Sequence, residues 1–177
     1  NVNTIGDVGV LENFYEYQLY CKSLYASIQD FTKKTMRALK VKSEEVFIEE
    51  IKSKYNAEDR LNWEIITIDP TLSKDFDDAL SMVDKGENML LSIYISNVSF
   101  WMDALDLWSS FTSRISTIYL PDRKRPMLPT VLSDALCSLQ ENRIRFAFTL
   151  DLLVNKESCE IIDSSFVNTC IKVTKNL

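Results

Sequence analysis

Apolar residues along this chain follow two spacings, a helical one near the start and an alternating one later. Over residues 27–40 and 43–55 they recur every three or four positions, which predicts two amphipathic helices. Ser27 and Ser43 stand at the start of these stretches and suit the capping position of a helix. We therefore expect residues 1–60 to form a helical lead-in segment.

Residues 61–177 carry the pattern of a sheet. Apolar and polar residues alternate over 143–154, which predicts a half-buried strand of an antiparallel or mixed sheet. Its apolar members are Ile144, Phe146, Phe148, Leu150, Leu152 and Val154. Shorter strands are expected at 63–68, 79–83 and 89–98. A hairpin turn, Asp-Lys-Gly-Glu-Asn, joins the last two, and a further β-rich stretch is expected after residue 158.

Helices are also expected between these strands. Asp103 is suited to cap a helix that runs to about residue 116, and a short helix is expected at 130–136. Three prolines between 121 and 129 predict an irregular loop of fixed shape. The predicted fold class is α+β, with a mixed or antiparallel sheet and packed helices.

Composition and charge exclude several classes of protein. The net charge of −6 excludes a globally basic nucleic-acid binder, although a local basic groove stays open. The chain has no histidine, which excludes Ser-His-Asp and Cys-His catalysis and histidine-ligated zinc within it. Its four cysteines form no Cys-x-x-Cys pair. Because no apolar run of about 18 residues and no signal segment occurs, we expect no membrane span. The expected location is intracellular, with the compartment open.

Four aspartates follow directly on the predicted strand at 63–68, namely Asp69, Asp75, Asp77 and Asp78. In extended geometry Asp75 and Asp77 point the same way and Asp78 points the opposite way. A bend in the loop would gather at least three carboxylates around one point. Gathered carboxylates repel one another, so the cluster needs a cation or raised pKa values. Magnesium or manganese is the natural partner, because each takes a few carboxylates and leaves room for water and phosphate.

The same spacing also fits an acidic turn in which the aspartates only cap the backbone. A calcium loop of the EF-hand type fits poorly, because the central glycine and the terminal glutamate are absent. The rigid strand before the aspartates and the apolar Phe76 among them favour a chemical role.

Four motifs in fixed order resemble the ribonuclease II/ribonuclease R (RNB) family. Residues 68–80 read I-D-P-T-L-S-K-D-F-D-D-A-L, similar to the family signature I-D-P followed by D-x-D-D-A. Residues 117–123 read T-I-Y-L-P-D-R and resemble the family's S-x-Y-L-P-D-R. Residues 126–129 (P-M-L-P) and 132–139 (L-S-D-A-L-C-S-L) match two further motifs. One departure lies at 94–98, where Y-I-S-N-V replaces the common H-I-A-D-V.

The resemblance implies a metal-dependent 3′→5′ exoribonuclease that hydrolyses single-stranded RNA and releases nucleoside 5′-monophosphates. Asp69, Asp75, Asp77 and Asp78 match the family's active-site aspartates and would hold Mg²⁺, or Mn²⁺ in its place. Tyr119 matches the tyrosine that packs against nucleotide near the 3′ end. Arg123, together with Lys124 and Arg125, would touch phosphates, but the same three residues fit an exposed run of charge equally well. Cys137 and Ser138 are interpreted as packing and loop-shaping residues.

The resemblance also implies that parts of an RNB protein lie outside these residues. Residues 61–177 would be the N-terminal portion of the catalytic domain, which makes the fold an incomplete RNB-type domain. The C-terminal half and the flanking OB-type RNA-binding domains would be missing, and a first residue other than methionine fits a piece of a longer protein. We expect the isolated chain to be inactive. The alternative is a non-catalytic module of the same fold that binds RNA or a partner.

Overall fold

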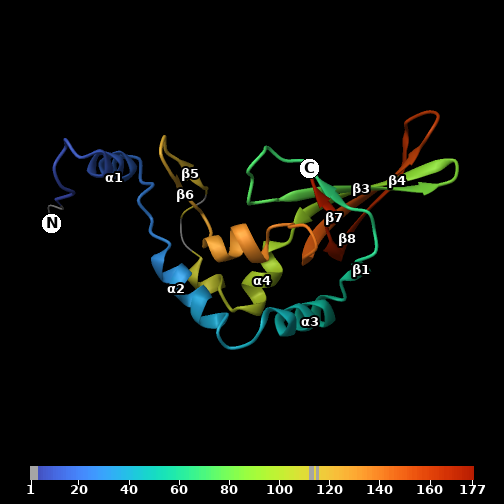
Figure 1. Ribbon diagram of the computed structural model, residues 1–177, viewed down its shortest axis with the longest axis horizontal. Coiled ribbons are helices and arrows are strands. Elements are labelled where there is room, and N and C mark those ends of the chain that lie inside the picture. The colour runs from blue at the N-terminus through green and yellow to red at the C-terminus, as the bar shows by residue number, and fades with distance from the viewer. Residues whose placement is uncertain (1–3, 112–113, 115) are drawn as a thin grey trace.

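A computed structural model describes residues 4–111, 114 and 116–177 (Figure 1). The helical elements of this part are α1 (Leu11–Cys21), α2 (Gln29–Ala38), α3 (Glu44–Tyr55), α4 (Val98–Ala104), the 3₁₀ turn η1 (Trp108–Ser110) and the π-helical turn η2 (Leu132–Leu136). The strands are β1 (Glu58–Arg60), β2 (Ile66–Thr67), β3 (Asp78–Lys85), β4 (Asn88–Ser96), β5 (Ile118–Tyr119), β6 (Lys124–Arg125), β7 (Ile144–Asn155), β8 (Ile161–Lys172) and β9 (Lys175–Asn176). No described helix has the length and apolarity needed to cross a membrane.

Most of the described strands form one curled sheet in the order β1-β8-β7-β4-β3-β2-β9. The pairs β1–β8 and β2–β9 are parallel, and the other neighbours are antiparallel. Only two residues separate the end of β8 from the start of β9, yet these strands lie far apart in the strand order. The sheet must therefore curl so that its two ends approach each other. The strands β5 and β6 form a separate hairpin.

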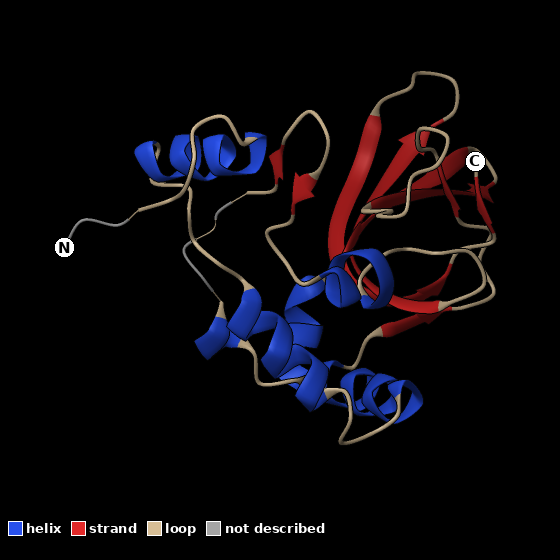
Figure 2. Cartoon of the chain, turned by 60° about the vertical axis from the view of Figure 1, so that its left-hand side comes forward, coloured by secondary structure: helices blue, strands red, loops and turns tan. Residues whose placement is uncertain are grey.

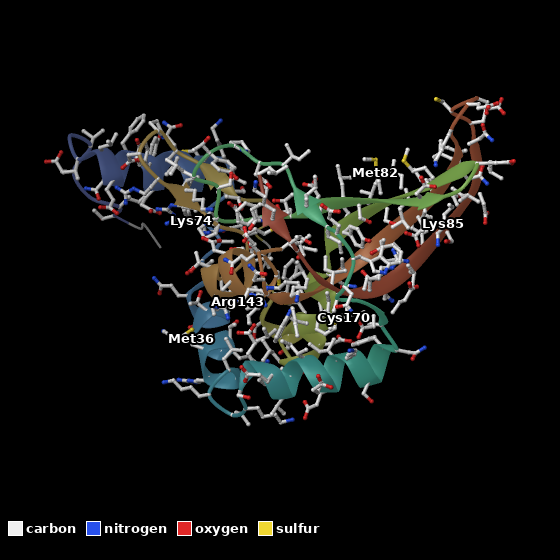
Figure 3. All side chains as sticks on the ribbon, turned by 45° about the vertical axis from the view of Figure 1, so that its right-hand side comes forward. Met36, Lys74, Met82, Lys85, Arg143 and Cys170 are labelled. Atoms are coloured by element: carbon white, nitrogen blue, oxygen red, sulfur yellow. The ribbon has the colours of Figure 1, made fainter. Side chains whose placement is uncertain are left out.

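The main apolar core lies where the helices pack on one end of the sheet (Figure 2). Trp101 of α4 is buried against Phe47 of α3, with ring centroids 6.3 Å apart. Phe100 stacks on Tyr55 at 3.9 Å and meets Phe146 of β7 edge-on at 5.7 Å. Figure 3 shows Cys170 of β8 on the side of the sheet that faces α3. These contacts fix the helices against β7 and β8.

The predicted α+β fold class and several of its elements are confirmed. The helix expected at 43–55 is α3, and the helix expected at 27–40 is the slightly shorter α2. The side chain of Ser27 accepts a hydrogen bond from the backbone N–H of Gln29 at 3.2 Å. The predicted hairpin is formed by β3 and β4, and the strand expected at 63–68 is reduced to β2.

The prediction of a helix that begins at Asp103 is wrong. The helix here is α4, which ends at Ala104, and Asp106 has a positive φ of 50° that no continuing helix can adopt. Asp103 caps no following helix, because its carboxylate accepts hydrogen bonds from the Tyr55 hydroxyl and the Trp108 indole N–H. Residues 112, 113 and 115 of the expected helix lie outside the described residues.

The strand predicted at 143–154 is confirmed as β7, but the prediction of which face of that strand is buried is wrong. The buried face of β7 is the one that carries Arg145, Thr149 and Asp151, whereas of the six apolar residues expected inside only Phe146 is buried. The curled sheet encloses Thr149 and Asp151, which bond to protein groups instead of to water: Thr149 to Thr169 of β8, and Asp151 to Arg60 of β1. Phe148, expected on the buried face, is 47% exposed and stacks on Phe166 of β8.

Candidate active site

The aspartates lie on the loop between β2 and β3, and Asp78 is the first residue of β3. Both ends of this loop are tied to strands. The backbone N–H of Asp69 donates to the carbonyl of Leu177 at 3.2 Å, next to β9. The carbonyl of Asp77 accepts from the N–H of Ser96, the last residue of β4, at 2.8 Å. The β-ladder therefore fixes where Asp69 and Asp77 leave the sheet.

Ser138 fastens the middle of the same loop. Its side chain is fully buried and accepts a hydrogen bond from the N–H of Phe76 at 3.0 Å. The same hydroxyl donates to the carbonyl of Lys74 at 2.9 Å. The next residue, Leu139, donates its N–H to the carbonyl of Phe76 at 2.8 Å. Ser138 therefore holds the backbone on both sides of Asp75, which agrees with its interpretation as a loop-shaping residue.

Replacing Ser138 by Ala should lower the free energy of unfolding by about 1–3 kcal/mol, because it leaves a buried N–H and a carbonyl without their partner. The backbone amide of Phe76 should then exchange its hydrogen faster than in the unaltered chain. Urea unfolding and amide exchange measure the two effects. The exposed Ser165→Ala on β8 is the matched control and should stay within about 0.5 kcal/mol of the unaltered chain. Equal stability of both variants would contradict the role given to Ser138.

The carboxylates are close enough to affect one another. Partial desolvation raises the pKa of Asp77, and the negative charges of the other three aspartates raise it further. Mutual repulsion of this kind is what the gathered cluster was expected to produce. Asp77 therefore lies within electrostatic range of the other three aspartates.

Asp75 has a different environment, because Lys124 reaches it from β6. The ammonium Nζ lies 3.1 Å from Oδ2 of Asp75. Desolvation pushes the pKa of Asp75 up, but the hydrogen bond and charge of Lys124 outweigh it and hold the pKa below its ordinary value. Asp75 is thus compensated by a protein cation, and Asp77 is not.

One carboxylate oxygen in the loop is buried without a protein partner. Oδ2 of Asp69 is inaccessible to solvent and receives no hydrogen bond. A buried oxygen of this kind is costly unless something else satisfies it. Within the described residues, no three carboxylates or thiols lie close enough together to hold one ion between them. The aspartates are therefore neighbours that still have to converge on a common point.

A pocket of about 380 Å³ adjoins the aspartates. Its lining includes Asp75 and Asp77 together with Tyr119 and Met127. Tyr119 belongs to β5, and its side chain is 75% exposed. An exposed ring beside carboxylates is free to stack on a ligand. The structure thus brings Tyr119 to the same place as the aspartates.

Arg123 is not brought to this pocket. Its guanidinium pairs with Glu12 of α1 at 3.0 Å and with the neighbouring Asp122 at 3.1 Å. Arg125 pairs in the same way with Glu16 of α1. Acidic side chains of α1 therefore form ion pairs with Arg123 and Arg125 of the β5–β6 hairpin region. Contact of Arg123 with RNA stays a prediction.

Residues that depart from the family pattern make structural bonds. Tyr94 is fully buried inside the curled sheet, where its hydroxyl is 2.9 Å from the Ser81 hydroxyl. Asn97 donates from its side chain to Asn168 at 3.2 Å. Burial raises the pKa of the Cys137 thiol to about 12, which fits a packing role for Cys137. Tyr94 and Asn97 do not line the aspartate pocket, whereas Ser96, the third departure in this segment, does.

The sequence and the fold are both similar to those of known proteins. A family model described as the RNB domain matches residues 57–177. Ribonuclease R of Chlamydia muridarum is 41% identical over 95 residues, covering 51% of this chain and 13% of that protein. The apo form of Mycoplasma genitalium RNase R matches with a TM-score of 0.62 and 25% identity, over 80% of this chain and 22% of its own.

The fold also occurs in yeast Ssd1, which is described as a pseudonuclease. It matches with a TM-score of 0.61 and 16% identity, over 71% of this chain and 16% of its own. The chain thus spans between 13% and 22% of the length of these relatives. Because the family model covers more than half of its residues, the chain belongs to the RNB domain family.

Proposed function

We propose that this protein is a metal-dependent 3′→5′ exoribonuclease that hydrolyses single-stranded RNA and releases nucleoside 5′-monophosphates. The observation that carries the proposal is that Asp75 and Asp77, on one tethered loop with Asp69 and Asp78, line an open pocket. Membership of the RNB domain family and the similarity to ribonuclease R support it. These 177 residues contain no histidine, so none of them can serve as an imidazole base for the hydrolytic water, and a bound metal ion can activate it instead.

The aspartates suit Mg²⁺ or Mn²⁺ as the resident ion. The buried, unsatisfied Oδ2 of Asp69 and the mutual repulsion around Asp77 are both relieved by a divalent cation. Asp69 and Asp78 would be the firmest ligands, and Asp75 and Asp77 would complete the set and hold the attacking water. When bound, the ion would lower the pKa of that water and neutralise phosphate charge.

Other residues of the chain would position the RNA. Tyr119 stands exposed at the pocket and would stack on a base near the 3′ end. Stacking accepts every base, which suits an enzyme that removes nucleotides one after another. Ser138 and Ser96 keep the loop backbone in place, so that Asp75 and Asp77 face the pocket while the RNA advances.

The test is degradation of a 5′-labelled single-stranded RNA by the product of the full open reading frame that contains these residues. With Mg²⁺ or Mn²⁺ the label should move down a ladder of shorter products, and with EDTA it should stay at full length. A 3′-labelled copy should release its label at once as a nucleoside 5′-monophosphate. Internal cleavage products, or shortening that persists in EDTA, would contradict the proposal.

A second candidate function is a non-catalytic RNA-binding or partner-binding module. Two observations favour it, namely that no three of the described carboxylates converge and that Lys124 already occupies Asp75. Fluorescence anisotropy with the same RNA in EDTA separates the two functions. Tight RNA binding combined with no shortening under any metal condition would favour the module.

A further inference from the structure

In the part of the chain that the structure describes, Lys124 is the one basic residue that forms an ion pair with any of the four aspartates. It lies on β6 directly opposite Tyr119 of β5. Its ammonium is 3.1 Å from Oδ2 of Asp75, and both side chains are about one-third exposed. Lys124 therefore connects the hairpin that it shares with the exposed Tyr119 to the loop that carries the aspartates.

Lys124 interacts with the four aspartates to different extents. It hydrogen-bonds Asp75 directly, and at longer range it lowers the pKa of Asp77 without overcoming the repulsion there. Oδ2 of Asp69 receives nothing from it. Of the four carboxylates, that of Asp75 is therefore the one paired with a protein cation in the described part of the chain.

We propose that Lys124 is an internal counter-cation of the aspartate loop, which holds Asp75 and has to release it before Asp75 can bind a divalent ion. The inference rests on the proposed metal dependence. A protein ammonium and a divalent cation repel each other and compete for the same carboxylate oxygen. Lys124 is thus a positioning residue that weakens metal binding by the chain and keeps the metal-free loop in a defined arrangement.

The proposal predicts that removing the ammonium tightens metal binding. For Lys124→Met we expect the Mn²⁺ dissociation constant to fall about three- to tenfold, because one competing charge is gone and the alkyl stem remains. Lys124→Arg keeps the charge and should stay within about twofold of the unaltered chain. The measurement is the decrease of the free Mn²⁺ electron paramagnetic resonance signal during titration of the full chain at fixed ionic strength.

Lys156→Met is the matched control. Lys156 pairs with Asp84 at 2.7 Å at the far end of the β3–β4 hairpin, so its loss changes the net charge equally without touching the aspartate loop. It should leave the Mn²⁺ affinity unchanged. Lys124→Gln is measured beside Lys124→Met so that the result does not depend on one folded variant.

The outcomes separate the inference from the function on which it rests. Equal or weaker Mn²⁺ binding by folded Lys124→Met and Lys124→Gln would overturn the role of Lys124 and leave the metal site standing. No Mn²⁺ binding by the unaltered chain or any variant would overturn both. Binding by Lys124→Met alone would support the inference in its strongest form, since Lys124 would then exclude the ion until released.

Discussion

Arg60→Met should lower the free energy of unfolding by about 3–5 kcal/mol. Arg60 is 3% exposed and lies inside the curled sheet, where its guanidinium donates to both carboxylate oxygens of Asp151 at 2.8 and 2.6 Å. Ser92 donates to the same carboxylate at 2.6 Å. The guanidinium also lies over the Trp63 ring, 4.3 Å from its centroid. Removing Arg60 leaves a buried charge without its partner, which costs far more than losing an exposed pair.

Urea denaturation of single and double variants measures this cost. Arg60→Met combined with Asp151→Leu should recover much of the lost stability, because an apolar pair replaces a buried ion pair without leaving a charge behind. Lys156→Met, which breaks the exposed pair with Asp84, should cost less than about 1 kcal/mol. A similar small loss for Arg60→Met would mean that the interior pair does not support the sheet.

The same pair predicts opposite responses to acid. Burial raises the pKa of Asp151, but the hydrogen bonds from Arg60 and Ser92 outweigh it and hold the pKa below its ordinary value. The stability that Asp151 contributes is therefore present above about pH 4, the ordinary aspartate pKa, and is lost as the pH falls further. In Arg60→Met the hydrogen bond from Ser92 remains, but it is a smaller effect than burial, which then raises the pKa of Asp151, so that variant should gain stability on mild acidification. Thermal melts between pH 4 and pH 7 distinguish the two.

The interior pair also shows why the sequence predicted the strands better than their surroundings. Alternation over 143–154 correctly predicted β7, but alternation states only that two faces differ. The polar face was therefore expected to meet water. Asp151 on that face is instead buried and paired with Arg60, which is 91 positions away in the sequence. Curling of the sheet joins these positions, and no local pattern carries that information. Helix α1 lies in the segment 1–60 that was expected to be helical, but no separate helix was predicted there, and its apolar Phe14 and Tyr17 remain exposed.

The candidate site was more predictable because its members are neighbours in sequence. Asp69 to Asp78 lie on one loop, so any compact bend brings them together, and Tyr119 followed from the motif around it. Lys124 was named only as one of several basic residues that could touch phosphate. Its contact with Asp75 joins residues 49 positions apart. The role of Ser138 likewise depends on a contact across 62 positions, and its place in the L-C-S-L motif was the only signal.

Asp77→Asn should lower kcat for RNA shortening by about a hundredfold or more, because it removes a charged oxygen from the proposed metal site. The same change should raise the stability of the metal-free chain. The pKa of Asp77 is raised in the folded state, so ionisation of this carboxyl costs stability as the pH rises through that value. At neutral pH the amide avoids that cost. Because Asp77 lies at the surface, we expect about 1 kcal/mol or less, or about 2–4 °C in Tm.

Opposite signs for activity and stability make this variant informative. In EDTA its Tm should exceed that of the unaltered chain, and the difference should shrink as the pH falls toward about 3.9, where the unfolded carboxyl also takes up its proton. Asp84→Asn is the matched control, because the hydrogen bond from Lys156 holds the pKa of Asp84 below its ordinary value. That control should lose a little stability and keep full activity. A stability loss in Asp77→Asn without metal would mean that the four carboxylates do not repel one another, and the main physical reason for a cation at this loop would be gone.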